Sequence, residues 1–260
     1  MPSRTAELLG ALDALRGPKA RLEVRTVGTV PTRHGEALPI PCYIQRGAVS
    51  PGFSFLRLAV FALVHGDEPA GGEAIQSLLA TTLLEPELLR GVELFCYPVC
   101  NPTGFEAGSR TNAAGLDLNR EFWRDSAQPE VQALEAELRL RRFDGLVSLH
   151  ADCDSSGLYA FARGAVTSEE LLAPALQAAE GILPRNTDRI IDGFDAEHGV
   201  IRDCYPGVLS PSPDQSPPPF EIILETPGGR PVEEQAEAAH RALLAILAEL
   251  PRLSIGGPDI

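Results

Sequence analysis

The chain has 260 residues, 44% of them apolar and 22% charged, which is the composition of an ordinary globular protein. Its 36 acidic and 22 basic residues give a formal net charge of −14. This balance argues against a nucleic-acid partner, because phosphate binding requires concentrated lysine and arginine. Lys19 is the only lysine, so nearly all positive charge is carried by arginine, whose planar guanidinium suits carboxylate binding.

The N-terminal residues lack the charged-then-apolar pattern of a signal peptide. No apolar run approaches the ~20 residues that a membrane span requires. We therefore expect a cytoplasmic protein without a membrane partner. The cysteines are scattered and odd in number, which argues against disulfides and against a cysteine metal site and predicts buried, reduced thiols. They are Cys42, Cys96, Cys100, Cys153 and Cys204.

Segments with helical and strand-like apolar patterns alternate along the chain, which predicts an α/β fold around a mixed, largely parallel sheet. The run at 55–64 is apolar almost throughout, as is typical of a central strand buried on both faces. Residues 99–127 show little periodicity, and loops of that length are usually functional. The predicted helices cover 3–15, 68–83, 128–142, 167–182 and 231–249, and the predicted strands cover 22–30, 38–46, 55–64, 92–98, 144–150 and 220–225.

Three residues that carry reactive side chains follow apolar strands directly: His65, His150 and Glu225. Ligands of open α/β sheets gather at the carboxyl ends of strands. Glu68 lies three residues after His65, and a catalytic zinc takes three protein ligands of these types, which makes His150 the candidate third ligand. The alternative for Glu68 is a favourable interaction with the positive end of the following helix.

Glu225 emerges from an apolar strand, so desolvation should raise its pKa, as suits a general base. The alternative is a glutamate that caps or pairs locally.

Two arginines and two asparagines of the long loop are candidates for binding substrate: Arg110, Asn112, Asn119 and Arg120. Their guanidinium and amide groups are suited to binding a carboxylate or polarising a carbonyl. The alternatives are a solvated charge for Arg110 and an ion pair with Asp117 for Arg120.

These segments together resemble the zinc carboxypeptidases of the carboxypeptidase A type, including the succinylglutamate desuccinylases and aspartoacylases. The resemblance covers roughly 55–250. It implies a three-layer α/β/α sandwich and a single catalytic domain at 1–260, with a helix and N-terminal strands in 1–50 and the family core in 51–250. It rests on His-x-x-Glu at 65–68, Asn-Pro-x-Gly at 101–104, Asp-Leu-Asn-Arg-x-Phe at 117–122, His150, and Glu-Thr at 225–226.

The resemblance implies that His65, Glu68 and His150 bind one Zn²⁺ per chain. Glu225 would then take a proton from the attacking water and later pass one to the leaving amine. Zinc chemistry agrees with this reading, because the ion lowers the pKa of water to around 7 and a nearby carboxylate can complete the deprotonation.

The resemblance also implies that Arg110 polarises the scissile carbonyl and that Asn119 and Arg120 bind the terminal carboxylate of the substrate. Tyr205 lies 20 residues before the expected base, so it is a candidate for the family's mobile tyrosine, although a buried loop tyrosine is the alternative. The Pro-rich loop at 206–219 should line the pocket that reads the substrate side chain.

Other polar residues near these motifs have weaker assignments. Asp152 and Asp154 are candidates for binding a substrate amine or for orienting His150. The remaining histidines are expected to be surface or structural residues: His34, His198 and His240.

The expected reaction is hydrolysis of an amide next to a free carboxylate, with a peptide C-terminus as the first expected substrate. One alternative is deacylation of an N-acyl amino acid, and another is trimming of cell-wall peptides. A non-catalytic metal-binding or carboxylate-binding relative is the alternative from a different class. The presence of every expected ligand and of the base argues against it.

Overall fold

The structure, a computed structural model, describes residues 3–17, 21–32, 35, 37–50, 52, 54–163 and 170–256. In this part of the chain a ten-stranded mixed sheet runs in the order β1-β2-β4-β3-β5-β10-β6-β9-β8-β7. The strands are β1 (Leu22–Pro31), β2 (Ala37–Arg46), β3 (Leu56–Phe61), β4 (Val92–Tyr97), β5 (Gly145–Asp152), β6 (Tyr159–Arg163), β7 (Ile190–Ile191), β8 (Phe194–Glu197), β9 (Val200–Ile201) and β10 (Phe220–Pro227).

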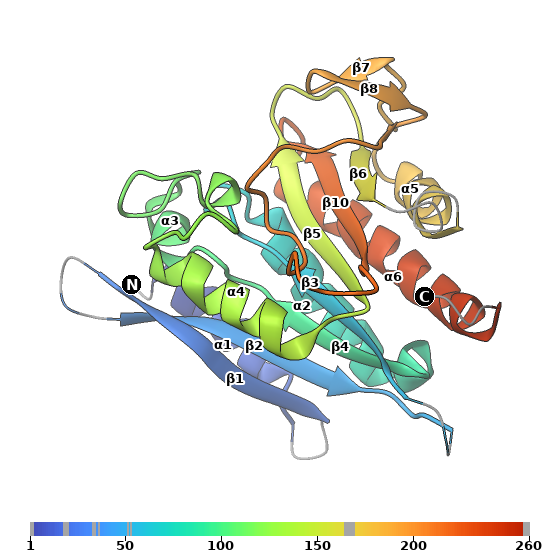
Figure 1. Ribbon diagram of the computed structural model, residues 1–260, viewed down its shortest axis with the longest axis horizontal. Helices are drawn as coiled ribbons and strands as arrows, with labels where there is room; N and C mark the ends of the chain where they lie inside the picture. Colours follow the sequence, from blue (N-terminus) through green and yellow to red (C-terminus); the bar gives the residue numbers. More distant parts are fainter. Residues whose placement is uncertain are drawn as a thin grey trace.

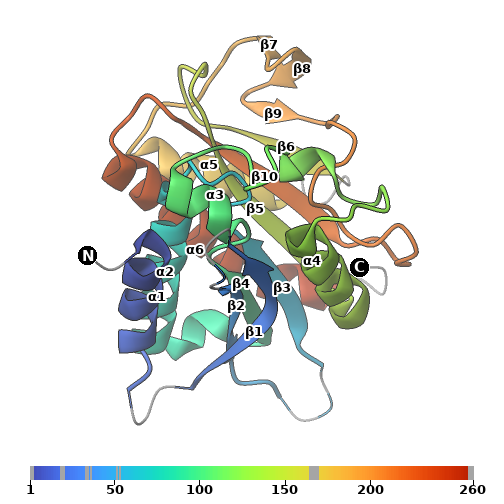
Figure 2. The same ribbon diagram turned by 90° about the vertical axis from the view of Figure 1, so that its left-hand side faces the viewer.

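Helices cover both faces of the sheet, as Figures 1 and 2 show. The predicted three-layer α/β/α sandwich is therefore confirmed. The helices are α1 (Arg4–Ala14), α2 (Ala70–Leu84), α3 (Pro102–Ala107), α4 (Pro129–Arg141), α5 (Leu172–Glu180) and α6 (Val232–Gly256), with short 3₁₀ turns η1 (Pro86–Leu89) and η2 (Leu118–Arg120).

The four central strands, β4, β3, β5 and β10, are parallel to one another, and antiparallel pairs flank them on both sides. Right-handed crossovers through helices place such strands side by side with their carboxyl ends at one edge. The β1–β2 hairpin extends one side of the sheet, as the alternating pattern of 22–30 and 38–46 predicts.

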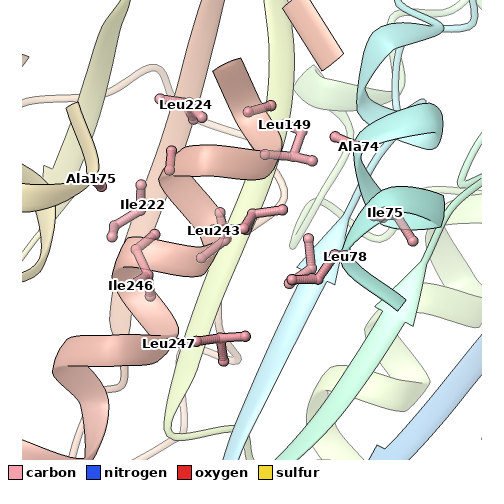
Figure 3. Packing of buried hydrophobic residues seen from close by; sticks show 14 of the residues in the cluster. Ala74, Ile75, Leu78, Leu149, Ala175, Ile222, Leu224, Leu243, Ile246 and Leu247 are labelled. Carbon is pink, nitrogen blue, oxygen red and sulfur yellow. The ribbon is translucent and has the colours of Figure 1, made fainter. Parts of the chain in front are cut away.

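Two large apolar clusters hold the layers together. The first lies between the sheet and helices α1, α2, α5 and α6, and Figure 3 shows its centre. Leu78 of α2 and Leu243 of α6 are both fully buried there, and both helices pack on residues such as Leu149 of β5. The second cluster lies on the opposite face under α4, around Phe61, Tyr97 and Phe143. Because both faces are covered, the central strands are mostly apolar.

The strand predicted at 55–64 is shorter in the structure. After Phe61 the chain leaves the sheet, and Leu63 adopts a positive φ of 54°. Residues 62–64 remain completely buried, because the backbone of 62 and 63 bonds to that of Cys100 and Asn101. The apolar run in the sequence is therefore longer than the strand, because residues 62–64 are buried although they lie outside the sheet.

The sequence analysis did not identify β6, β7, β8 and β9. Three of these strands have only two to four residues, which is too short for an apolar alternation to stand out. The helix predicted at 167–182 is present as α5, and its predicted first residues lie outside the described part of the chain. Within the described residues, none of the helices has the length and apolar character needed to cross a bilayer.

Candidate metal centre and substrate pocket

Three neighbouring parallel strands deliver reactive side chains to one edge of the sheet. Strand β5 lies between β3 and β10, and His150 of β5 is in register with Glu225 of β10. His65 follows β3 after a buried turn. These three residues therefore lie at one site, although His65 and Glu225 are 160 positions apart in the sequence. This grouping is expected, because the carboxyl ends of neighbouring parallel strands meet at one edge of the sheet.

The turn that carries His65 is fixed by the Asn-Pro-x-Gly segment. Asn101 donates from its amide to the carbonyl of Val64. Its side-chain oxygen accepts from the N–H of Gly104, which makes Asn101 the N-cap of α3. Gly66 packs directly on the backbone of Gly104, because a Cβ at position 66 would lie 2.0 Å from the Gly104 carbonyl carbon. Only a glycine at position 66 allows this approach, so Gly66 and the Asn-Pro-x-Gly segment together position the turn.

His65, Glu68 and His150 form a buried cluster whose potential ligand atoms lie within 4.8 Å of one another. The Nδ1 atoms of the two histidines are 3.2 Å apart. One Glu68 oxygen lies 2.7 Å from His65 Nδ1 and the other lies 3.0 Å from His150 Nδ1. All three side chains are at most 7% exposed.

The other nitrogen of each ring is already bonded. Asp117 Oδ1 lies 3.0 Å from His65 Nε2, and Ser148 Oγ lies 2.9 Å from His150 Nε2. If each Nε2 donates its proton outward, both Nδ1 lone pairs point to the shared space between the rings. Burial lowers the pKa of His150, which favours the neutral, ligating form. Burial also lowers the pKa of His65, but hydrogen bonds to Asp117 and Glu68 outweigh it and raise the net value.

This donor set fits a tetrahedral divalent metal. Two nitrogens each ~2.05 Å from a tetrahedral zinc would lie about 3.3 Å apart, close to the 3.2 Å between the two Nδ1 atoms. A carboxylate completes three protein ligands, the number typical of a catalytic zinc. The cluster is therefore a candidate metal site, in agreement with the ligand set expected from the sequence.

A cavity of about 590 Å³ opens beside this cluster, within the size range of small-molecule sites. His65, Glu68 and Glu225 line it, together with Arg110 and Arg120. The carboxylate of Glu225 reaches the cavity, yet protein surrounds most of the side chain. Burial raises its pKa well above the ordinary value, and the negative charge of Glu68 raises it further.

Arg110 lies between the metal cluster and the cavity. Its Nη1 is 3.6 Å from Glu68 Oε1, and its Nη2 is 3.1 Å from Asp117 Oδ2. Nearly half of its side chain remains exposed. Asp117 thus pairs with Arg110 and His65, so the predicted alternative of an Asp117 ion pair with Arg120 is wrong.

Asn119 and Arg120 meet the loop that follows β9. Asn119 Oδ1 accepts from the N–H of Leu209 at 2.7 Å, which leaves its amide nitrogen to face the cavity it lines. The guanidinium of Arg120 lies 4.4 Å from the centre of the Tyr205 ring and donates to the Asn119 carbonyl. Among the described residues it has no carboxylate partner within 4.0 Å, so its charge is available in the cavity.

Tyr205 lines the same wall, and its hydroxyl donates to the backbone and side chain of Asp192. Asp152, a candidate for orienting His150, instead accepts hydrogen bonds from Tyr159 and from the N–H of Asp154. The orienting role for Asp152 is therefore wrong, because Ser148 occupies that ring nitrogen of His150.

Sequence reasoning missed Asp117, Ser148, Tyr159 and Asp192 as parts of this site. Asp117 belonged to a motif that was recognised, but it was considered only as an ion-pair partner of Arg120 and not as a partner of His65. Ser148 carried a usable signal, since residues two apart on a strand point to the same face. No local pattern distinguished Asp192, which reaches the site through a turn far along the chain.

The remaining histidines and the cysteines agree only in part with the expectations from the sequence. His240 lies on α6 and contacts Thr81, away from the cavity, and His198 is exposed, so both are surface or structural as expected. His34 lies outside the described residues. The cysteines are free, and Cys42, Cys96 and Cys100 are buried as expected. Cys153 is exposed and Cys204 is only half-buried, so the expectation of burial is wrong for Cys153 and met only in part for Cys204.

Solved structures identify the fold. A candidate metallopeptidase from Shewanella amazonensis superposes with a TM-score of 0.75 at 24% identity, over 94% of this chain and 91% of its own. A metallo-carboxypeptidase from Pseudomonas aeruginosa, solved with (2-guanidinoethylmercapto)succinic acid, gives 0.65 at 22% identity, over 96% and 69%. The chain thus has the metallocarboxypeptidase fold.

A family model identifies the family to which this fold belongs here. The succinylglutamate desuccinylase/aspartoacylase catalytic domain matches residues 54–185, just over half of the chain, and the chain belongs to this family. Carboxypeptidase SOL1 from Arabidopsis thaliana is 35% identical over 103 residues, which make up 34% of this chain and 21% of that protein. The match spans about a fifth of this relative. The chain is therefore related to hydrolases of the carboxypeptidase or deacylase type, as the sequence motifs predicted.

Proposed function

We propose that this protein is a zinc-dependent hydrolase that cleaves an amide bond next to a free carboxylate. One observation carries the proposal. A single cavity is lined by the His65–Glu68 side of a candidate metal cluster, by the half-buried side chain of Glu225, and by Arg120, which has no carboxylate partner among the described residues. These are the groups needed to hold a metal, move a proton and bind an anion.

His65, Glu68 and His150 would hold the metal through the two Nδ1 atoms and a carboxylate oxygen. When bound, the metal supplies a Lewis acid for the scissile carbonyl and lowers the pKa of water to about 7. Asp117 and Ser148 keep the two rings oriented through their Nε2 atoms.

Glu225 accepts the proton of the attacking water at its carboxylate and delivers a proton to the leaving amine. Burial and the negative charge of Glu68 raise its pKa, which makes the carboxylate a stronger proton acceptor than an exposed one. A cation held next to it would offset part of the repulsion from Glu68 and so lower this pKa.

Arg110 lies between Glu68 and open cavity, so it is placed to donate to the carbonyl oxygen as negative charge develops there. Arg120 and the Asn119 amide bind the carboxylate of the substrate. The guanidinium of Arg120 is suited to this task, because no carboxylate in the described part of the chain pairs with it. Tyr205, stacked on Arg120, forms the wall beside that carboxylate.

Two substrate classes meet these requirements, and each has support. The metallocarboxypeptidase fold favours a peptide C-terminus, whereas the family name favours an N-acyl amino acid. Both carry an amide next to a carboxylate. Incubating the zinc-loaded protein with matched peptide and N-acyl amino acid panels separates them. Release of only the acyl acid, with no C-terminal residue freed from any peptide, would exclude the peptidase.

The direct test of the mechanism is Glu225→Gln. We expect kcat to fall by several hundredfold or more while bound zinc is retained, because general base catalysis typically contributes ~10²–10⁴-fold. Glu221→Gln is the matched control, since it changes the same group on the same strand outside the cavity lining. Its activity should stay within about twofold of the wild type. Unchanged turnover in Glu225→Gln would show that the base is another group.

A further inference from the structure

The residue three positions after Arg120 has an unusual backbone conformation. Trp123 adopts a positive φ of 58° in the turn between η2 and α4. A left-handed backbone is uncommon for residues other than glycine, and it is an outlier for a side chain as bulky as tryptophan. Such conformations persist only where the surrounding structure enforces them, and they cluster near functional sites. The contacts of Trp123 should therefore show what this conformation achieves.

Helix α4 holds Trp123 from one side. The Trp123 N–H donates to Glu135 Oε1 at 2.6 Å, and this carboxylate is only 11% exposed. The guanidinium of Arg139, one turn further along α4, lies 4.9 Å from the centre of a Trp123 ring. It also lies 3.6 Å from the other oxygen of Glu135. A charge-assisted hydrogen bond and a stacked cation thus fix the backbone and the ring of Trp123 relative to α4.

The indole ring contacts the loop that follows β9 on its other side. Its Nε1 donates to Ser210, with the carbonyl oxygen and the hydroxyl oxygen both at 3.1 Å. Ser210 is buried, so this bond is shielded from water. Trp123 therefore bridges α4 and this loop. The bridge belongs to two neighbouring segments, 119–123 and 207–210, here called the loop pair.

Two further hydrogen bonds join the loop pair. The Phe122 N–H donates to the Gly207 carbonyl at 3.1 Å, and the Leu209 N–H donates to Asn119 Oδ1 at 2.7 Å. Phe122 and Leu209 are both buried in the second apolar cluster, under α4. Arg120 lies between Asn119 and Phe122 in the chain, so its backbone is held on both sides by bonds to the opposite segment.

Arg120 is the cation that the proposed function assigns to the substrate carboxylate. Among the described residues its guanidinium has no carboxylate partner within 4.0 Å; it lies 4.4 Å from the centre of the Tyr205 ring and donates to the Asn119 carbonyl. Tyr205 is two residues before Gly207, and Asn119 belongs to the loop pair. Both supports of the guanidinium therefore depend on how the two segments are held together.

We infer that Trp123 is a positioning residue for the carboxylate site. It ties the loop pair to α4 and thereby holds the backbone of Arg120 and the ring of Tyr205 in the arrangement that receives the substrate carboxylate. This role rests on the proposed function. It concerns substrate binding rather than proton transfer, because the described contacts of Trp123 are to α4 and to the loop after β9, not to the metal ligands.

The kinetic test is Trp123→Phe in the full-length, zinc-loaded protein, with N-acetylalanine and Ala-Ala as substrates. The change removes the Nε1 donor and keeps an aromatic ring. We expect KM to rise by about 3- to 10-fold with kcat within about twofold, because a single hydrogen bond changes an equilibrium by roughly this factor.

A double-mutant cycle shows whether Trp123 acts through Arg120. In an Arg120→Ala background, Trp123→Phe should change kcat/KM by less than about twofold, because the group that it positions is already gone. An unchanged KM in the single variant, a fall in kcat alone, or an equal loss in both backgrounds would overturn the positioning role.

Hydrogen exchange measures the same bridge without turnover. In Trp123→Phe the protection of the Phe122 and Leu209 N–H groups should fall by about tenfold, because the loop pair opens more readily. Tyr97→Phe is the matched control: it removes another aromatic donor of the second apolar cluster, the hydroxyl bonded to buried Glu137 at 3.0 Å. It should leave KM and both protection factors within about twofold of the wild type.

Ser210→Ala is the second variant, and it serves if Trp123→Phe does not fold. It removes one of the two acceptors, so KM and protection should change in the same direction by a smaller factor. If neither substrate is cleaved, the proposed function fails and exchange decides the role of Trp123. Loss of protection confined to the loop pair supports it, and unchanged protection or an equal loss in Tyr97→Phe overturns it. Cleavage with KM and protection unchanged in Trp123→Phe would leave the proposed hydrolase intact and overturn the role of Trp123.

Discussion

Replacing Asp117 with asparagine should weaken metal binding without removing a ligand. Asp117 Oδ1 lies 3.0 Å from His65 Nε2, and its other oxygen pairs with Arg110. The change keeps the shape of the side chain but removes the charge that holds the His65 ring. Hydrogen bonds to charged groups contribute about 1.5–3 kcal/mol, and loss of such outer contacts typically costs 10–100-fold in metal affinity. A tenfold change in affinity corresponds to ~1.4 kcal/mol, so the free energy of the hydrogen bond and the expected loss of metal affinity agree.

The assay is competition with a zinc chelator at fixed pH, with the dissociation constant as the result. Asp67→Asn is the matched control, because Asp67 is an exposed carboxylate in the same cavity without a contact to the ligands among the described residues. A dissociation constant for Asp117→Asn that is within twofold of the wild type would refute the orienting role. An equal loss in both variants would show that net charge in the cavity, rather than the bond to His65, determines affinity.

Further predictions concern stability and the loop that borders the cavity. The carboxyl of Glu221 is buried with one oxygen unpartnered, and burial raises its pKa from 4.5 to about 7. The folded state therefore binds the extra proton between these values, and the free energy of unfolding should fall as pH rises through this window, by up to about 3 kcal/mol. Urea unfolding of Glu221→Gln should show it more stable than the wild type at pH 8 and equal at pH 4. A constant difference at both pH values would contradict this. Gly207→Ala should raise KM for carboxylate substrates and cost ~1–3 kcal/mol, because φ is +81° and the new Cβ meets Arg120. Gly91→Ala has a similar φ in open space, so it should cost stability without changing KM, and matching KM values would argue against this role for Gly207.

The fold could be predicted largely from local pattern. The long central strands and the amphipathic helices each bury a distinct face, so their periodicity is visible in the sequence. The short strands β7 to β9 could not be predicted, because two to four residues bury too little surface to impose a pattern. The residue at which β3 ends could not be predicted from the sequence either, because residues 62–64 remain buried after the strand ends.

The candidate metal residues could be named because each follows a strand directly, and strands of one parallel sheet end at one edge. The sequence alone thus determined that two histidines and two glutamates belong to one place. It also indicated that an arginine-bearing loop accompanies them.

Only the tertiary structure decided how these residues are supported and what surrounds them. His65 meets Asp117 across 52 positions, and Asn119 meets Leu209 across 90. Such contacts leave no local trace, because neither partner imposes a pattern on its own segment. A smaller apolar cluster beside the cavity has the same origin, because its members Phe161, Val208 and Ile223 come from two strands and a loop. Their side chains form one surface only when β6 pairs with β10 and the loop folds over both.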